Sequence, residues 1–264
     1  MRKHLALATA VALTLTATAI APAAPPTNSE SKLKARIIPS KLPKKRFRNA
    51  SLFVDTSTVY PNDGGTPTHP TKRPEPTTHV VIDFDDDGTV RPGAVATCKV
   101  SDAAFENFTG TIFQATQMCG RKSVLGSGIA TVCLAGATGN DCGGVNQPEQ
   151  ADVIAFNGQP KNRKPTVYLY AKGKGDIAAI GQELTGTIRR SPLGGDYGKR
   201  LDVPVPPLGG GIGALTDFRV TVSKGSYIRA RCHDRNHRLN ARARFTYNDG
   251  TSEVVRSKQR CRIA

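Results

Sequence analysis

The stretch that decides the fold class is the C-terminal segment 241–255, ARARFTYNDGTSEVV. Apolar residues alternate with Arg and Thr from Ala241 to Tyr247, which is the period of a strand with one buried face. Asn248-Asp249-Gly250 follows as a turn signal, and residues 252–255 return as a second strand. The segment therefore predicts an antiparallel hairpin.

The rest of the chain repeats this behaviour at short spacing. The 264 residues include 26 Gly and 18 Pro, a turn-rich composition that argues against a helical bundle. With the hairpin, about eleven strands are expected, at 35–38, 51–56, 80–85, 124–134, 152–156, 166–171, 183–189, 215–223 and 226–232. We expect a mainly β fold, an antiparallel β-sandwich, formed as a single domain over residues 34–264.

One helix is expected inside this β fold, over about residues 101–119. Ser101 is a suitable N-cap, and apolar residues follow at helical spacing from Phe105 to Cys119. A loop with prolines at 61, 67, 70, 74 and 76 is expected between Tyr60 and Thr78. Asn157-Gly158 is expected to form a turn.

The first residues read as a targeting segment. Residues 1–23 carry a basic start, an uncharged apolar run and small residues near a cleavage point, as in a secretory signal peptide. A membrane anchor is the alternative, because the run is at the short limit of a span. Residues 24–33 are expected to be flexible, and no later run is apolar enough to cross a membrane. The mature chain is thus expected to be secreted or associated with the cell envelope.

Six cysteines fit that export route, because an even number after a signal peptide usually forms disulfides. None has the C-x-x-C spacing of a redox or zinc site. Each consecutive pair flanks one local unit, and chain order therefore suggests the pairs Cys98–Cys119, Cys133–Cys142 and Cys232–Cys261.

A formal net charge of +16 indicates attraction to acidic partners, or a charge that only maintains solubility. Arg229 and Arg231 alternate on one expected strand, and Arg242 and Arg244 on a later one. If these strands were neighbours, four guanidinium groups would share one face suited to phosphate, sulfate or carboxylate. Stacking aromatics are scarce nearby, so no specific nucleic-acid binding is expected.

The motif Asp83-x-Asp85-x-Asp87-Gly88 resembles the start of a calcium loop. An EF-hand is excluded, because Ala94 stands where its bidentate Glu would be. Another kind of calcium loop stays open, and no cofactor other than calcium is expected. The alternative is a strand with Asp83 and Asp85 on its solvent face, ending in an Asp-Asp-Gly turn.

No hydrolytic motif is present: the G-x-S-x-G elbow and the H-E-x-x-H helix are both missing. We therefore expect a non-catalytic exported protein that holds acidic cell-envelope polymers. A secreted hydrolase acting on polysaccharide is one alternative, since dispersed carboxylates leave no local pattern. A protein–protein interaction module using the loop 60–78 is another.

Several segments, in order, resemble a group of uncharacterised, exported, β-rich proteins of high-GC Gram-positive bacteria. They are KLPKKRFR at 41–48, DFDDDG at 83–88, AFNG at 155–158, residues 201–218, and FTYNDGT at 245–251 followed by Cys261. The resemblance spans about residues 36–261 and brings no established activity. It implies that the cysteines at 98, 119, 232 and 261 recur, with those at 133 and 142 as an extra pair.

Overall fold

The computed structural model describes residues 28–62, 64–136, 141–142, 149–233 and 238–264. The predicted signal peptide, residues 1–23, lies outside the described residues. In the part of the chain that is described, no helix is long and apolar enough to cross a membrane.

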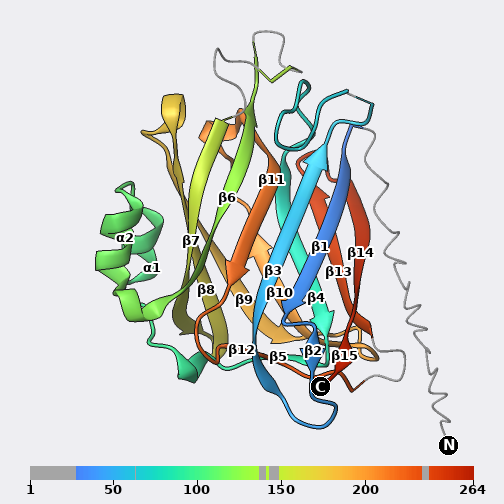
Figure 1. Cartoon of the computed structure of the whole chain (residues 1–264). Helices are drawn as coiled ribbons and strands as arrows, with labels where there is room; N and C mark the ends of the chain where they lie inside the picture. The colour runs from blue at the N-terminus through green and yellow to red at the C-terminus, as the bar shows by residue number, and fades with distance from the viewer. Residues whose placement is uncertain (1–27, 63, 137–140, 143–148, 234–237) are drawn as a thin grey trace, which may run out of the picture.

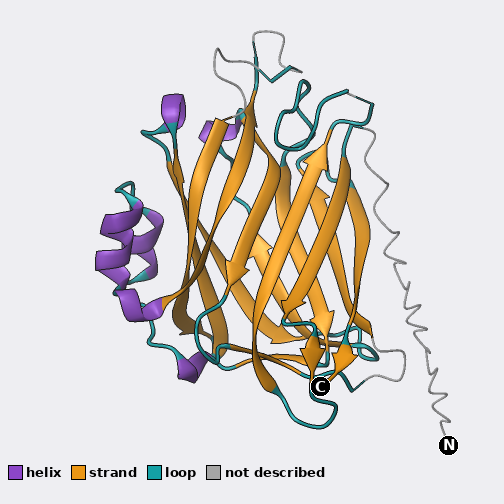
Figure 2. Ribbon diagram, in the orientation of Figure 1, coloured by secondary structure: helices purple, strands orange, loops and turns teal. Residues whose placement is uncertain are grey.

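The described chain is dominated by strands, with two short α-helices and four 3-10 turns (Figure 2). The strands are β1 (Glu30–Ile38), β2 (Lys41–Leu42), β3 (Arg48–Val59), β4 (Thr77–Asp85), β5 (Gly88–Val90), β6 (Val124–Leu134), β7 (Glu149–Lys161), β8 (Lys164–Gly173), β9 (Gly181–Arg190), β10 (Tyr197–Pro204), β11 (Gly213–Val222), β12 (Ile228–Ala230), β13 (Arg238–Tyr247), β14 (Ser252–Arg260) and β15 (Arg262–Ile263). The helices and turns are α1 (Asp102–Glu106), α2 (Ile112–Cys119), η1 (Pro92–Ala94), η2 (Arg121–Ser123), η3 (Gly175–Ile177) and η4 (Gly209–Gly211).

Thirteen strands form one sheet in the order β14-β13-β4-β10-β9-β8-β7-β6-β11-β3-β12-β5, with β1 also paired to β3. Every pairing within this sheet is antiparallel. The predicted mainly β, antiparallel class is confirmed. The two layers of the expected sandwich are the front and back of this single sheet, which folds over on itself (Figure 1).

The sheet closes where β1 meets β14, through side chains of β14 that bind the backbone of β1. The Ala35 amide donates to Ser257 Oγ at 3.1 Å, and the Ser31 amide donates to Glu253 Oε2 at 2.7 Å. Gln259 both accepts from the Ile37 amide at 2.6 Å and donates to the Ile37 carbonyl at 2.8 Å. All four bonds join residues 222 positions apart, so β1 and β14 lie side by side, run parallel and keep one register. The result is a flattened, closed sheet.

The main core fills the inside of the closed sheet, with Leu33, Ile82, Leu169 and Phe245 among its members. A second core lies outside it, between the helices and the outer face of β7 and β8. There the Phe105 ring stacks on Tyr168, with 4.7 Å between ring centroids.

The prediction of a single helix over 101–119 is wrong in detail, because the structure has two helices, α1 and α2, in this range. Ser101 caps α1 as predicted, accepting a hydrogen bond from the Ala104 amide. Thr111 is extended and begins α2 with a reciprocal capping box to Gln114, so the chain leaves helical geometry between the two helices. The Tyr170 hydroxyl donates to the Gly110 carbonyl in this break.

Two further predictions need correction. The segment 24–33, expected to be flexible, overlaps β1, which begins at Glu30 because its alternate residues enter the core. Asn157-Gly158 is not a turn but lies within β7, where the Asn157 amide group donates to the carbonyls of Pro92, Val95 and Ala96. The turn falls later, at two residues of positive φ between β7 and β8, Asn162 and Arg163.

All three disulfides pair as chain order suggests: Cys98–Cys119, Cys133–Cys142 and Cys232–Cys261. No described cysteine is free. Such bonds are typical of proteins in oxidising compartments outside the cytosol.

Candidate anion-binding face

The predicted ladder of Arg229, Arg231, Arg242 and Arg244 does not exist as one face, because β12 and β13 are not neighbours. β12 pairs with β3 and β5, whereas β13 pairs with β14 and β4. On β12, Arg229 donates to a backbone carbonyl and Arg231 donates to Asp87 at 2.7 Å. These two arginines therefore bond to other parts of the protein at the end of the sheet.

Asp83 lies at the centre of an arginine-rich row on the outer face and is fully buried there. Arg200 approaches it with two hydrogen bonds of 2.7 and 2.8 Å, Ser191 donates at 2.7 Å, and Arg242 lies at 3.6 Å. The prediction that Asp83 is exposed to solvent is therefore wrong, because the neighbouring guanidinium groups cover its carboxylate. A buried, bidentate pair of this kind is a structural anchor.

Asp85 and Asp87, the other residues of the predicted calcium loop, are also buried and bonded within the protein. Asp85 accepts from the amides of Asp87 and Asn240, and Asp87 accepts from Arg231 and the His233 amide. Burial is the main reason that the pKa of the Asp85 carboxyl is raised to about 7. Carboxylate oxygens of residues 85–87 lie within 4.8 Å of one another, but Asp83 is not in this group. Calcium binding at this loop stays a prediction.

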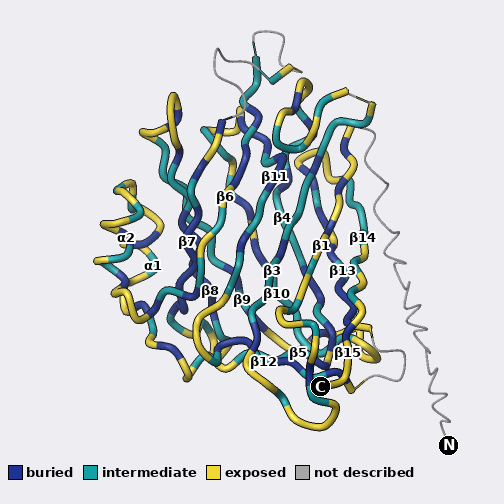
Figure 3. The backbone as a smooth tube through the Cα atoms, in the orientation of Figure 1, coloured by how far each residue is buried: buried dark blue, intermediate teal, exposed yellow. Residues whose placement is uncertain are grey.

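A different concentration of positive charge lies on the outer surface of β1, β14 and β13. Along β1 and β14 the residues alternate between the inside of the closed sheet and the solvent (Figure 3). We call eight of the outward basic side chains of these three strands the basic face: Lys32, Lys34, Arg36, Arg242, Arg244, Arg256, Lys258 and Arg260.

The sheet register brings these charges next to each other. Arg256 stands directly opposite Arg242, and the offset of 222 between β1 and β14 places Lys34 beside Arg256. Like charges in directly opposed positions destabilise a sheet. Arg242 is compensated by Asp83, and Lys32 by Glu30 at 3.4 Å. For the other six members of the basic face, no described acidic group lies within ion-pairing distance.

The geometry of strands sets the spacing of these charges. Successive outward residues on one strand are about 7 Å apart, and neighbouring strands are about 4.8 Å apart. The basic face is therefore a grid of cations that suits an extended chain of anionic groups better than one small anion.

Only Arg242 and Arg244 of the basic face were among the predicted site residues. The signal for the others was present as two alternating runs, Lys32 to Arg36 and Arg256 to Arg260. The first run fell in the segment expected to be flexible, and the second lay just beyond the expected end of the last strand.

The fold and this surface define a disulfide-linked, antiparallel β protein with one strongly basic side. Comparison with protein-family models, with curated proteins and with solved structures finds no match.

Proposed function

We propose that this protein is a non-catalytic, exported protein that holds acidic polymers of the cell envelope on its basic face. The observation that carries this proposal is the set of six cations on three adjacent strands with no acidic partner among the described residues. An anionic polymer lying along β1 and β14 would relieve their mutual repulsion.

The proposed location outside the cytosol is argued from the disulfides and from the predicted signal peptide. Three disulfides suit an oxidising compartment outside the cytosol, where wall polymers and acidic polysaccharides are accessible. The predicted signal peptide over 1–23 supplies a route to that compartment.

Binding would be ionic and multivalent. Guanidinium forks pair with phosphate, sulfate or carboxylate, and each exposed pair alone is weak. Several weak contacts to one polymer add up through effective concentration. Because the contacts are exposed, salt should screen them.

The test compares two variants that remove the same amount of charge. The basic-face variant carries Lys34→Gln, Arg256→Gln, Lys258→Gln and Arg260→Gln. The control variant carries Lys99→Gln, Arg121→Gln, Lys122→Gln and Lys164→Gln, which are exposed residues. The first three flank α1 and α2 in the sequence and Lys164 begins β8, and these elements lie on the other side of the molecule from β1 and β14 (Figure 1).

Affinity is measured on a purified acidic polysaccharide and on linear polyphosphate, at ~50 and ~200 mM salt. We expect wild-type binding to fall at least about tenfold over this range. The basic-face variant should bind at least about tenfold more weakly than wild type at low salt, and the control variant less than about threefold more weakly. Equal losses of affinity in the two variants would show that binding depends only on the net charge, and would overturn the proposal.

A further inference from the structure

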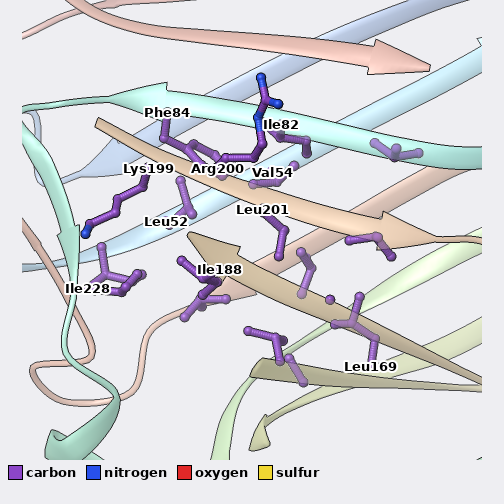
Figure 4. A pocket seen from close by; sticks show the side chains of 18 of the residues that line it. Leu52, Val54, Ile82, Phe84, Leu169, Ile188, Lys199, Arg200, Leu201 and Ile228 are labelled. Carbon is purple, nitrogen blue, oxygen red and sulfur yellow. The ribbon is translucent and has the colours of Figure 1, made fainter. Parts of the chain in front are cut away.

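The inside of the closed sheet contains a cavity of about 160 Å³. Residues of every strand of the sheet except β6, β13 and β14 line it, among them Val54, Ile82, Leu169, Ile188 and Leu201 (Figure 4). Arg200 turns its guanidinium group away from the other lining side chains, toward Asp83, and the Lys199 amino group lies at one end of the cavity, near Ile228 (Figure 4). The interior surface is thus almost wholly apolar.

A void of this size is unusual in a protein core, which normally has few spaces larger than a water molecule. A cavity of roughly 150 Å³ with a similar aliphatic lining stays dry and binds benzene in another protein. The space here is therefore large enough for one small ring or a short alkyl chain.

Among the lining residues, Tyr227 has a buried hydroxyl without a described hydrogen-bond partner. The residue as a whole is 1% exposed. Buried polar groups are normally bonded, so this exception needs an explanation. Burial raises the pKa of the Tyr227 hydroxyl far above its usual range, which keeps the proton in place for donation.

Water is a poor candidate for that missing partner. A buried water needs two to four polar contacts, and the walls around Tyr227 are mainly aliphatic. A ligand with an apolar body and a single oxygen satisfies both the walls and the hydroxyl.

We propose that this cavity binds a small, mainly apolar molecule, a substituted ring or short alkyl chain, whose one oxygen accepts a hydrogen bond from Tyr227. This site is separate from the basic face. Ile82 and Asp83 illustrate the separation, because they are adjacent residues of β4. Ile82 lines the cavity, whereas Asp83 bonds to Arg200 on the outer face.

Benzene and phenol are the probes, since they differ by one hydroxyl. Each is titrated into the full chain, and the methyl NMR signals of the lining residues are followed. We expect saturable binding of both probes, with shifts at Ile82, Ile188 and Leu201. Tyr227→Phe should weaken phenol binding about 2- to 10-fold and leave benzene within about twofold.

A second substitution fills the space. Ala155 lines the cavity, so Ala155→Leu should weaken both probes strongly. If that variant does not fold, Val220→Ile gives the same readout with one added carbon. The absence of saturable binding of either probe to wild type would overturn the proposal. An equal loss of phenol and benzene in Tyr227→Phe would do so as well, because it would show that the hydroxyl makes no specific bond.

Discussion

Two buried tyrosines differ in what surrounds their hydroxyl groups. The Tyr247 hydroxyl lies 2.6 Å from Ser31 Oγ and 3.2 Å from Glu253 Oε2, whereas the Tyr227 hydroxyl has no described partner. Removing one member of a buried hydrogen-bonded pair costs about 1–3 kcal/mol. We therefore expect Tyr247→Phe to lower the free energy of unfolding by about 1–2 kcal/mol. Tyr227→Phe should leave it unchanged or raise it by up to about 1 kcal/mol.

Urea unfolding of the two variants, compared with wild type, gives both numbers. A loss in Tyr227→Phe as large as that in Tyr247→Phe would mean that the Tyr227 hydroxyl has a partner in the free protein.

The buried Asp85 carboxyl predicts a dependence of stability on pH. Its pKa is about 7 in the folded protein against 3.8 for an ordinary aspartate, so the folded state keeps a proton between these two pH values that the unfolded state releases. The stabilisation of the folded state by this proton on Asp85 is complete below pH 4 and is lost as the pH rises to 7. One proton gives a slope of at most about 1.4 kcal/mol per pH unit.

Asp85→Asn removes this titration and keeps the shape of the side chain. Unfolding of wild type and variant is measured from pH 4 to 8 with a chelator present. The free energy of wild type should fall relative to the variant across pH 4 to 7. Parallel curves would show that the Asp85 carboxyl is charged throughout in the folded protein.

At the scale of elements, the closure between β1 and β14 depends on a few side chains. Gln259 makes two hydrogen bonds to the backbone of Ile37, and its neighbour Lys258 points to the solvent. We expect Gln259→Ala to cost about 1–3 kcal/mol, at roughly 1 kcal/mol per bond, and Lys258→Ala to cost less than about 0.5 kcal/mol.

Hydrogen exchange distinguishes local opening from general destabilisation. In Gln259→Ala the amide of Ile37 should lose protection before the amides of β7 and β8 do. Uniform loss across the sheet would show that Gln259 does not act at this seam.

The strands with clean alternation were predictable, and the terminal hairpin is the best example. β10 was missed, because Gly198 and Pro204 interrupt its pattern and its outward Arg200 and Asp202 have partners on neighbouring strands. The break between α1 and α2 was missed, since the apolar spacing continues across it. It is set by Thr111 and by contacts of Gly110 with Tyr170.

At the scale of the whole molecule, local patterns could not predict which strands become neighbours. The pairing of β13 with β4, and the contact of β1 with β14, join segments more than 150 residues apart. The basic face and the cavity both depend on those contacts between distant strands. The predicted ladder was wrong for the same reason, because the sequence does not show that β12 and β13 are not neighbours. The cysteine pairing was predictable, because each pair closes a short loop.

The three disulfides should contribute unequally to the stability of the whole fold. The Cys232–Cys261 pair spans 29 residues and the Cys133–Cys142 pair spans 9. Loop-closure entropy predicts a larger loss, about 1 kcal/mol more, when Cys232 and Cys261 are replaced by Ala than when Cys133 and Cys142 are. Thermal unfolding of the two double variants provides the comparison, and the reverse order would contradict this reasoning.

The central claim is that the basic face holds an anionic polymer through several ionic contacts. Its most direct test is the slope of log affinity against log salt concentration for linear polyphosphate. With about 0.7 counterions released per contact, the basic-face variant should have a slope about 3 shallower than wild type, while the control variant keeps the wild-type slope. A slope that changes equally in both variants, or in neither, would contradict the account.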